Sequence, residues 1–145
     1  GLNKLDTKNK LGATLFNNYR RSWDIAPPIM SSDSPNLNKF SPLNKLIPID
    51  KIPKTESLKD TYIRVLDYYT NNIELNIKNN KTVIITAHGN SLRALCKYIF
   101  NITDKKINKL EIPTGNPMII QFNEKLEATN AYYLDNDRSM PILNL

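Results

Sequence analysis

The only histidine of the chain, His88, lies within residues 84–93, which read IITAHGNSLR. An unbroken apolar run, TVIITA at residues 82–87, precedes it and predicts a strand covered on both faces. The apolar spacing after it predicts a helix from Ser91. Ligands of open α/β sheets bind outside the carboxyl ends of strands, and helix N-termini attract anions. These residues therefore predict an oxyanion site, with phosphate as the favoured ligand.

The residues next to His88 suit such a site. Gly89 has no Cβ, so a ligand can approach the backbone closely, and Asn90 adds an amide. Ser91 offers either a hydroxyl to the ligand or a cap to the helix. The pattern leaves a second interpretation open, in which His88 only bonds a carbonyl at the end of a strand and Ser91 only caps.

A pair of arginines, Arg20 and Arg21, precedes a Pro-rich stretch. Two guanidinium groups suit bidentate binding of phosphate, although adjacent arginines also occur as plain solvated charge. The net charge of +6 agrees with an anionic partner. Because the lysines are scattered and form no stripe, we favour a small anionic ligand over nucleic acid, and a basic nucleic-acid-binding module remains an alternative.

The elements that must position these residues form one layered α/β domain. We expect a helix over residues 4–19, a Pro-rich loop over 31–53, a long helix that begins at Ser57 with a capping box, and antiparallel strands at 118–122 and 128–134. We expect the helix after His88 to bury Leu92, Leu95, Cys96 and Ile99 and to leave Arg93 and Lys97 outside.

No apolar run approaches the roughly 20 residues of a membrane span, and the N-terminus is too polar for a signal peptide. The single cysteine, Cys96, excludes a disulfide within the chain. We therefore expect a soluble cytoplasmic protein that does not bind membranes.

Several motifs together resemble the 2,3-bisphosphoglycerate-dependent phosphoglycerate mutases. They are GLNK (1–4), RRSWDIAPP (20–28), TESLKDT (55–61), AHGNSLRALCKY (87–98), EIPTGNPM (111–118) and YYL (132–134). Their order and spacing match that family over nearly the whole chain. The resemblance implies a three-layer α/β/α fold with a mixed, mostly parallel sheet, of which residues 1–145 would be the C-terminal part of a single domain, with a tail at 135–145.

The resemblance also implies an activity and a set of roles. The family interconverts 3- and 2-phosphoglycerate in glycolysis through a phosphohistidine, primed by 2,3-bisphosphoglycerate and without a metal. By this resemblance, His88 stabilises the transferring phosphoryl group, whereas Gly89, Asn90, Lys4, Arg20 and Arg21 bind substrate. The expected partners are small phosphorylated three-carbon acids, and the complete enzyme is expected to be a homo-oligomer.

The chain departs from the family pattern in one important way. The family's first half carries an RHG motif with the nucleophilic histidine, a phosphate-clamping arginine and the acid/base glutamate, and none of these motifs occurs here. We therefore expect the N-terminal strands to be missing and the 145-residue chain by itself to be inactive. The alternative is a non-catalytic remnant that at most binds anionic phosphometabolites.

Overall fold

The computed structural model describes residues 3–31, 34, 46–48 and 52–142. The elements, in chain order, are α1 (Lys4–Leu11), α2 (Ala13–Arg21), α3 (Leu58–Tyr68), the π-helix η4 (Tyr69–Ile73), α4 (Glu74–Lys78), α5 (Gly89–Ile99), the 3₁₀-helix η5 (Ile107–Lys109), β1 (Met118–Phe122) and β2 (Ala128–Tyr133). The Pro-rich loop expected at 31–53 lies largely outside the described residues.

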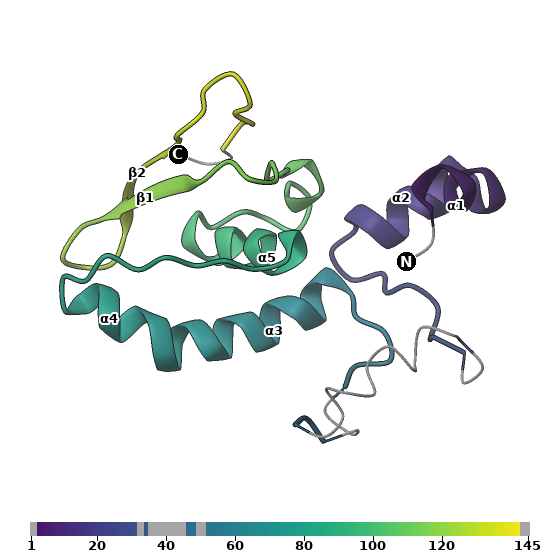
Figure 1. Cartoon of the computed structure of the whole chain (residues 1–145), viewed down its shortest axis with the longest axis horizontal. Coiled ribbons are helices and arrows are strands. Elements are labelled where there is room, and N and C mark those ends of the chain that lie inside the picture. The colour runs from purple at the N-terminus through teal and green to yellow at the C-terminus, as the bar shows by residue number, and fades with distance from the viewer. Residues whose placement is uncertain (1–2, 32–33, 35–45, 49–51, 143–145) are drawn as a thin grey trace.

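Helix α5 occupies the middle of the molecule. Figure 1 shows it between the long helical segment α3–α4 on one side and the β1–β2 hairpin on the other, with α1 and α2 on a separate arm. The arm meets the rest of the described structure where α2 contacts η5. The end of α2, which carries Arg20 and Arg21, is thereby held beside the segment that follows α5.

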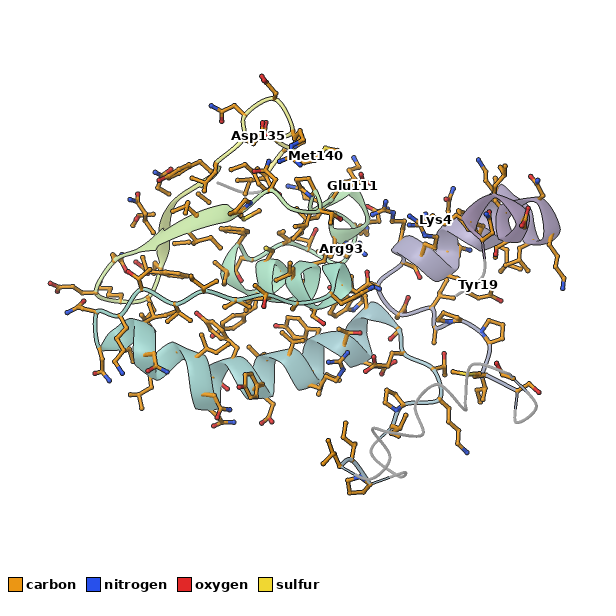
Figure 2. The ribbon with its side chains drawn as sticks, viewed as in Figure 1. Lys4, Tyr19, Arg93, Glu111, Asp135 and Met140 are labelled. Carbon is orange, nitrogen blue, oxygen red and sulfur yellow. The ribbon has the colours of Figure 1, made fainter. Side chains whose placement is uncertain are left out.

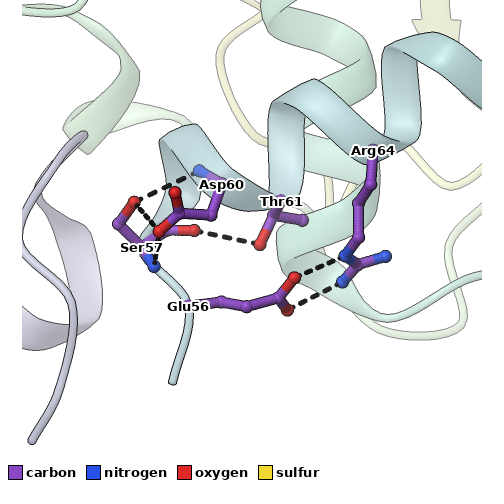
Figure 3. Close-up of polar contacts among 5 residues, drawn as sticks. All are labelled: Glu56, Ser57, Asp60, Thr61 and Arg64. Atoms are coloured by element: carbon purple, nitrogen blue, oxygen red, sulfur yellow. Dashed lines mark hydrogen bonds and ion pairs between the residues drawn. The ribbon is translucent and has the colours of Figure 1, made fainter. Parts of the chain in front are cut away.

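The start of α3 is fixed by the expected capping box (Figure 3). The Ser57 hydroxyl accepts from the Asp60 N–H at 3.2 Å, and the Asp60 carboxylate accepts from the Ser57 N–H at 2.9 Å. Arg64 donates two hydrogen bonds to Glu56, at 2.6 and 2.9 Å. Two orphan N–H groups of the first turn are thus satisfied within the segment, which confirms the predicted helix start.

The helix expected over residues 4–19 is two helices. Gly12 separates them with φ at 77°, a left-handed value that suits glycine because it has no Cβ. The glycine ends α1, where its N–H donates to the Lys8 carbonyl, and it precedes the first residue of α2.

The core gathers around α5 and the segment that follows it. Its buried members are Leu58, Ala94, Cys96, Phe100, Ile102, Ile107 and Leu110. Partly buried side chains of β1 and β2, among them Met118, Ile120 and Ala131, pack against this cluster. The hairpin and α3 therefore cover α5 from two directions.

The sheet of the described residues has two strands, β1 and β2, which pair antiparallel as expected. Met118 pairs with Tyr133, and an irregularity between Gln121 and Phe122 shifts the register before the turn. The α/β class is confirmed in this coarse form. The mixed, mostly parallel sheet is not, since the described residues contain no parallel pair.

The prediction of a strand at residues 82–87 is wrong, because the described structure has no strand there. The segment runs from α4 back to α5 without strand pairing (Figure 1), and Ile84 is 88% exposed. The physical reason is that an apolar run becomes a strand only when a neighbour pairs with its backbone. Here no such neighbour lies among the described residues.

Lys97 was also placed wrongly, on the outer face of α5. Its ammonium lies 4.6 Å from the centre of the Trp23 ring and donates to the Ile102 carbonyl at 2.6 Å. It also pairs with Asp104 at 2.8 Å. The long side chain lets the charged head bond carbonyl and ring groups while its stem is covered.

Candidate functional site

His88 is the N-cap of α5, which begins two residues earlier than expected, at Gly89. Its Nδ1 accepts a long hydrogen bond of 3.4 Å from the Asn90 N–H, and its carbonyl accepts from the Leu92 N–H at 3.1 Å. An Nδ1 that accepts leaves the ring proton on Nε2, which can then donate to a ligand. The residue is exposed, so the imidazole is both oriented by the helix start and accessible.

Gly89 and Asn90 form the first turn of α5, whose free N–H groups and dipole favour an anion. A Cβ built on Gly89 would meet no protein atom within 4 Å, so the space beside its backbone is open. Its φ is not among the positive values, and backbone geometry therefore does not require a glycine here. The Asn90 Oδ1 accepts from Arg93 Nη1 at 3.3 Å.

Arg93 is buried, contrary to the prediction that it lies outside. It is 4% exposed, and it donates to the Leu110 carbonyl at 3.0 Å and to the Ile107 carbonyl at 2.8 Å. These acceptors come from η5 and the residue after it, and the Ile107 carbonyl also accepts from the Leu110 N–H at 3.2 Å. Five N–H donors in a planar fork let one arginine bond several oxygens at once.

The pKa of Arg93 is shifted by its charged neighbours. Its pKa is lowered to about 10, chiefly by burial and then by repulsion from Arg21 and, more weakly, Arg20, while attraction to Glu111 opposes the shift. The Arg21 guanidinium forms an ion pair with the Glu111 carboxylate. Figure 2 shows Glu111 and Arg93 at the side of the molecule that faces the helical arm. The arginines of α2 and the start of α5 therefore share one neighbourhood.

The site residues expected from the sequence are thus only partly gathered. Arg20 and Arg21 are close enough to Arg93 to repel it, and Arg93 is bonded to Asn90. The Arg20 guanidinium also lies over the Phe16 ring, with its Cζ 5.2 Å from the ring centre. Lys4 begins α1 and is exposed (Figure 2). Within the described part of the chain, Lys4 makes no hydrogen bond or ion pair with that group.

Sequence reasoning missed Arg93 and Glu111. The spacing of Arg93, three residues after Asn90 in a helix, puts the two side chains on one face and was a usable signal. The partner of Arg21 had no signal, since Glu111 is 90 residues away in the sequence.

Arg93, which is bonded to Asn90 in the first turn of α5, is close enough to Arg20, Arg21 and Glu111 for their charges to act on it. This excess of positive charge, with the imidazole of His88 at the same helix end, can bind an oxyanion and stabilise charge on a transferring phosphoryl group. Within the part of the chain that the structure describes, no group of His, Cys, Asp and Glu side chains could hold a metal ion.

Two hollows of the described structure lie away from this group. One of about 500 Å³ opens between Tyr69, the end of α5 and the hairpin turn, and a second of about 330 Å³ lies beside β2 and the tail. Neither is lined by a candidate site residue. In the described residues, no helix is both long enough and apolar enough to cross a membrane.

Comparison with known proteins defines the class. Residues 41–134 match the histidine phosphatase superfamily (branch 1), and the chain belongs to this superfamily. It is also similar to the 2,3-bisphosphoglycerate-dependent phosphoglycerate mutase of Pelagibacter ubique (strain HTCC1062), with 46% identity over 147 aligned positions. The alignment covers 99% of this chain and 60% of the length of that relative. The resemblance to phosphoglycerate mutases is thereby confirmed.

Proposed function

We propose that this chain is part of a phosphoglycerate mutase that interconverts 3- and 2-phosphoglycerate with 2,3-bisphosphoglycerate as primer. The observation that carries the proposal is that Arg93, on the helix that His88 caps, bonds Asn90 and is repelled by the nearby charges of Arg20 and Arg21. The similarity to the Pelagibacter ubique mutase supports the choice of substrate. The primer is part of the proposal because the name of that relative includes 2,3-bisphosphoglycerate. The proposed reaction uses no metal.

The proposed roles follow from the chemistry of phosphoryl transfer, in which charge spreads over the equatorial oxygens of the phosphoryl group. Nε2 of His88 donates to one of these oxygens and stabilises it. The Gly89 N–H and the side-chain amide of Asn90 bind others, and Arg21 and Arg20 bind the anionic substrate from the side of α2. Lys4 adds a further cation when α1 approaches the ligand.

Turnover through a phosphohistidine needs a nucleophilic histidine in addition to the one that stabilises the phosphoryl group. His88 is the only histidine among the 145 residues, and it takes the stabilising role in this proposal. We therefore propose that the 145 residues by themselves bind phosphoglycerate but do not interconvert it. A non-catalytic protein that binds phosphorylated metabolites is the second candidate, favoured by the same single histidine.

The proposal is tested first by calorimetric titration with 3-phosphoglycerate. Binding is expected, and Arg21→Ala should weaken it by about tenfold or more, because a charged hydrogen bond contributes about 1.5–3 kcal/mol. Lys78→Ala is the matched control, since it also removes one positive charge but lies on α4, at the other end of the molecule from α2 (Figure 1). Absence of binding by the unmodified protein would overturn the proposal.

An activity assay tests the lack of turnover that both candidates predict for the 145 residues. The 145-residue chain is incubated with 3-phosphoglycerate and a catalytic amount of 2,3-bisphosphoglycerate, and 2-phosphoglycerate is measured. We expect a rate several powers of ten below that of an ordinary mutase, as is typical when members of a catalytic unit are removed. A rate within tenfold of an ordinary mutase would make His88 itself the nucleophile. We further propose that the protein is cytoplasmic. We also propose that the complete enzyme is a homo-oligomer, and size-exclusion chromatography of the complete enzyme tests this.

A further inference from the structure

The guanidinium of Arg93 is the most deeply buried charge described in the structure, and its hydrogen bonds go to neutral oxygens. It donates from Nε to the Leu110 carbonyl, from Nη2 to the Ile107 carbonyl and from Nη1 to the Asn90 Oδ1, at 3.0, 2.8 and 3.3 Å. Removing an ion from water is costly unless its bonds offset the loss. Two neutral carbonyls and an amide offset only part of that cost, so packing alone does not explain why an arginine is buried here.

The three bonds join two separate parts of the candidate site. Asn90 is in the first turn of α5, next to the cap residue. Ile107 and Leu110 belong to the turn that directly precedes Glu111, and Glu111 holds Arg21 by an ion pair. A continuous path of bonded groups therefore runs from the helix start at Asn90 through Arg93 to Arg21 of α2.

The charges around this path are unbalanced. Arg21 and Arg20 both repel the Arg93 cation, and Glu111 is the carboxylate that attracts it. A second negative group at this place would relieve the repulsion among the three guanidinium groups. A bound phosphate monoester, which carries close to two negative charges at neutral pH, has the charge that the group lacks.

We propose that Arg93 is a positioning residue of the anion site, which holds the Asn90 amide and, through the turn before Glu111, the Arg21 guanidinium against one phosphorylated ligand. This inference rests on the proposed function, because it assigns Arg93 to the same site. Arg93 itself does not touch the ligand. It acts through a fork of N–H donors that lysine, with one ammonium group, cannot reproduce.

The test is a double-mutant cycle on the affinity for 3-phosphoglycerate, with the folded fraction of each variant measured by circular dichroism. We expect Arg93→Lys and Asn90→Ala each to weaken binding by about tenfold. The double variant should be weakened far less than the hundredfold product, because both changes disrupt the same contact. Lys78→Ala should again have little effect.

The outcomes separate the inference from the proposed function. If the unmodified protein does not bind 3-phosphoglycerate, the proposed function fails. If it binds, but folded Arg93→Lys binds equally well, or the two losses multiply in full, Arg93 is a structural residue and the inference is overturned.

Arg93→Lys could fail to fold, since the side chain is buried, and an NMR titration of the unmodified protein then decides. The Arg93 Nε–H and the Asn90 side-chain amide should shift together along one binding curve. A shift of the Asn90 amide with an unchanged Arg93 signal would overturn the inference.

Discussion

The environment of Lys97 predicts that this lysine contributes to stability far more than an ordinary surface lysine. Its ammonium donates to the Ile102 carbonyl, contacts the face of Trp23 and pairs with Asp104. The side chain is 12% exposed, whereas that of Asp104 is 62% exposed. Lys97→Met keeps most of the stem and removes the charge, so it isolates the contribution of the ammonium group.

The expected loss can be worked out contact by contact. A hydrogen bond from a charged group contributes about 1.5–3 kcal/mol, and a cation–π contact about 0.5–2 kcal/mol. The ion pair with the exposed Asp104 adds at most about 1 kcal/mol. Since the three contacts share one ammonium and are not additive, we expect Lys97→Met to lower the free energy of unfolding by about 2–4 kcal/mol.

Urea denaturation followed by tryptophan fluorescence measures this loss, because Trp23 is the only tryptophan and lies against the lysine. With a slope of about 2 kcal/mol/M, the midpoint should fall by about 1–2 M. Asp104→Asn, the matched control, should cost less than about 1 kcal/mol. The reasoning is refuted if Lys97→Met costs under about 0.5 kcal/mol, or if the control costs as much.

Three further predictions concern local features. Gly12→Ala should destabilise the chain by about 1 kcal/mol in the same urea assay, because a left-handed φ of 77° strains any residue with a Cβ. Hydrogen bonds from Ser57 lower the pKa of Asp60. The contribution of the Asp60 carboxylate to stability is therefore complete above the ordinary carboxyl range near pH 4 and is lost as the pH falls through the lowered pKa. Ser57→Ala should raise that pKa in a carboxyl NMR titration, and an unchanged pKa would contradict the assignment. Amide hydrogens of residues 83–87 should exchange rapidly in the 145-residue chain, and strong protection there would show that the segment pairs with a strand.

Local signals in the sequence predicted the local structure well. The spacing of Ser57 and Asp60 predicted a capping box, and the structure has both of its hydrogen bonds. The two apolar segments separated by a short polar turn predicted the antiparallel hairpin, which ends at Tyr133, one residue before the predicted end. Such features depend on residues within a few positions of one another, so one sequence is enough to find them.

The errors on α5 have a different cause. Arg93 and Lys97 were assigned to the outer face because charged residues in a helical pattern usually lie in water. Both instead reach carbonyl groups, those of Ile107 and Leu110 for Arg93 and that of Ile102 for Lys97. Their partners come from the irregular segment after the helix, and its path cannot be deduced from helical periodicity.

Residues 82–87 show most clearly what a local pattern leaves undetermined. Their β-branched apolar side chains fit a strand, yet Val83 and Ile85 are half-buried while Ile84 between them is exposed. One face is thus partly covered, but the backbone lacks the pairing that defines a strand, since strand stability depends on a partner elsewhere in the chain.

His88 follows this segment but does not depend on it for its orientation. Its ring and carbonyl are bonded to the first turns of α5, and α5 is held in the core by Ala94, Leu95 and Cys96. The candidate site is therefore built on a helix start that the described residues themselves stabilise.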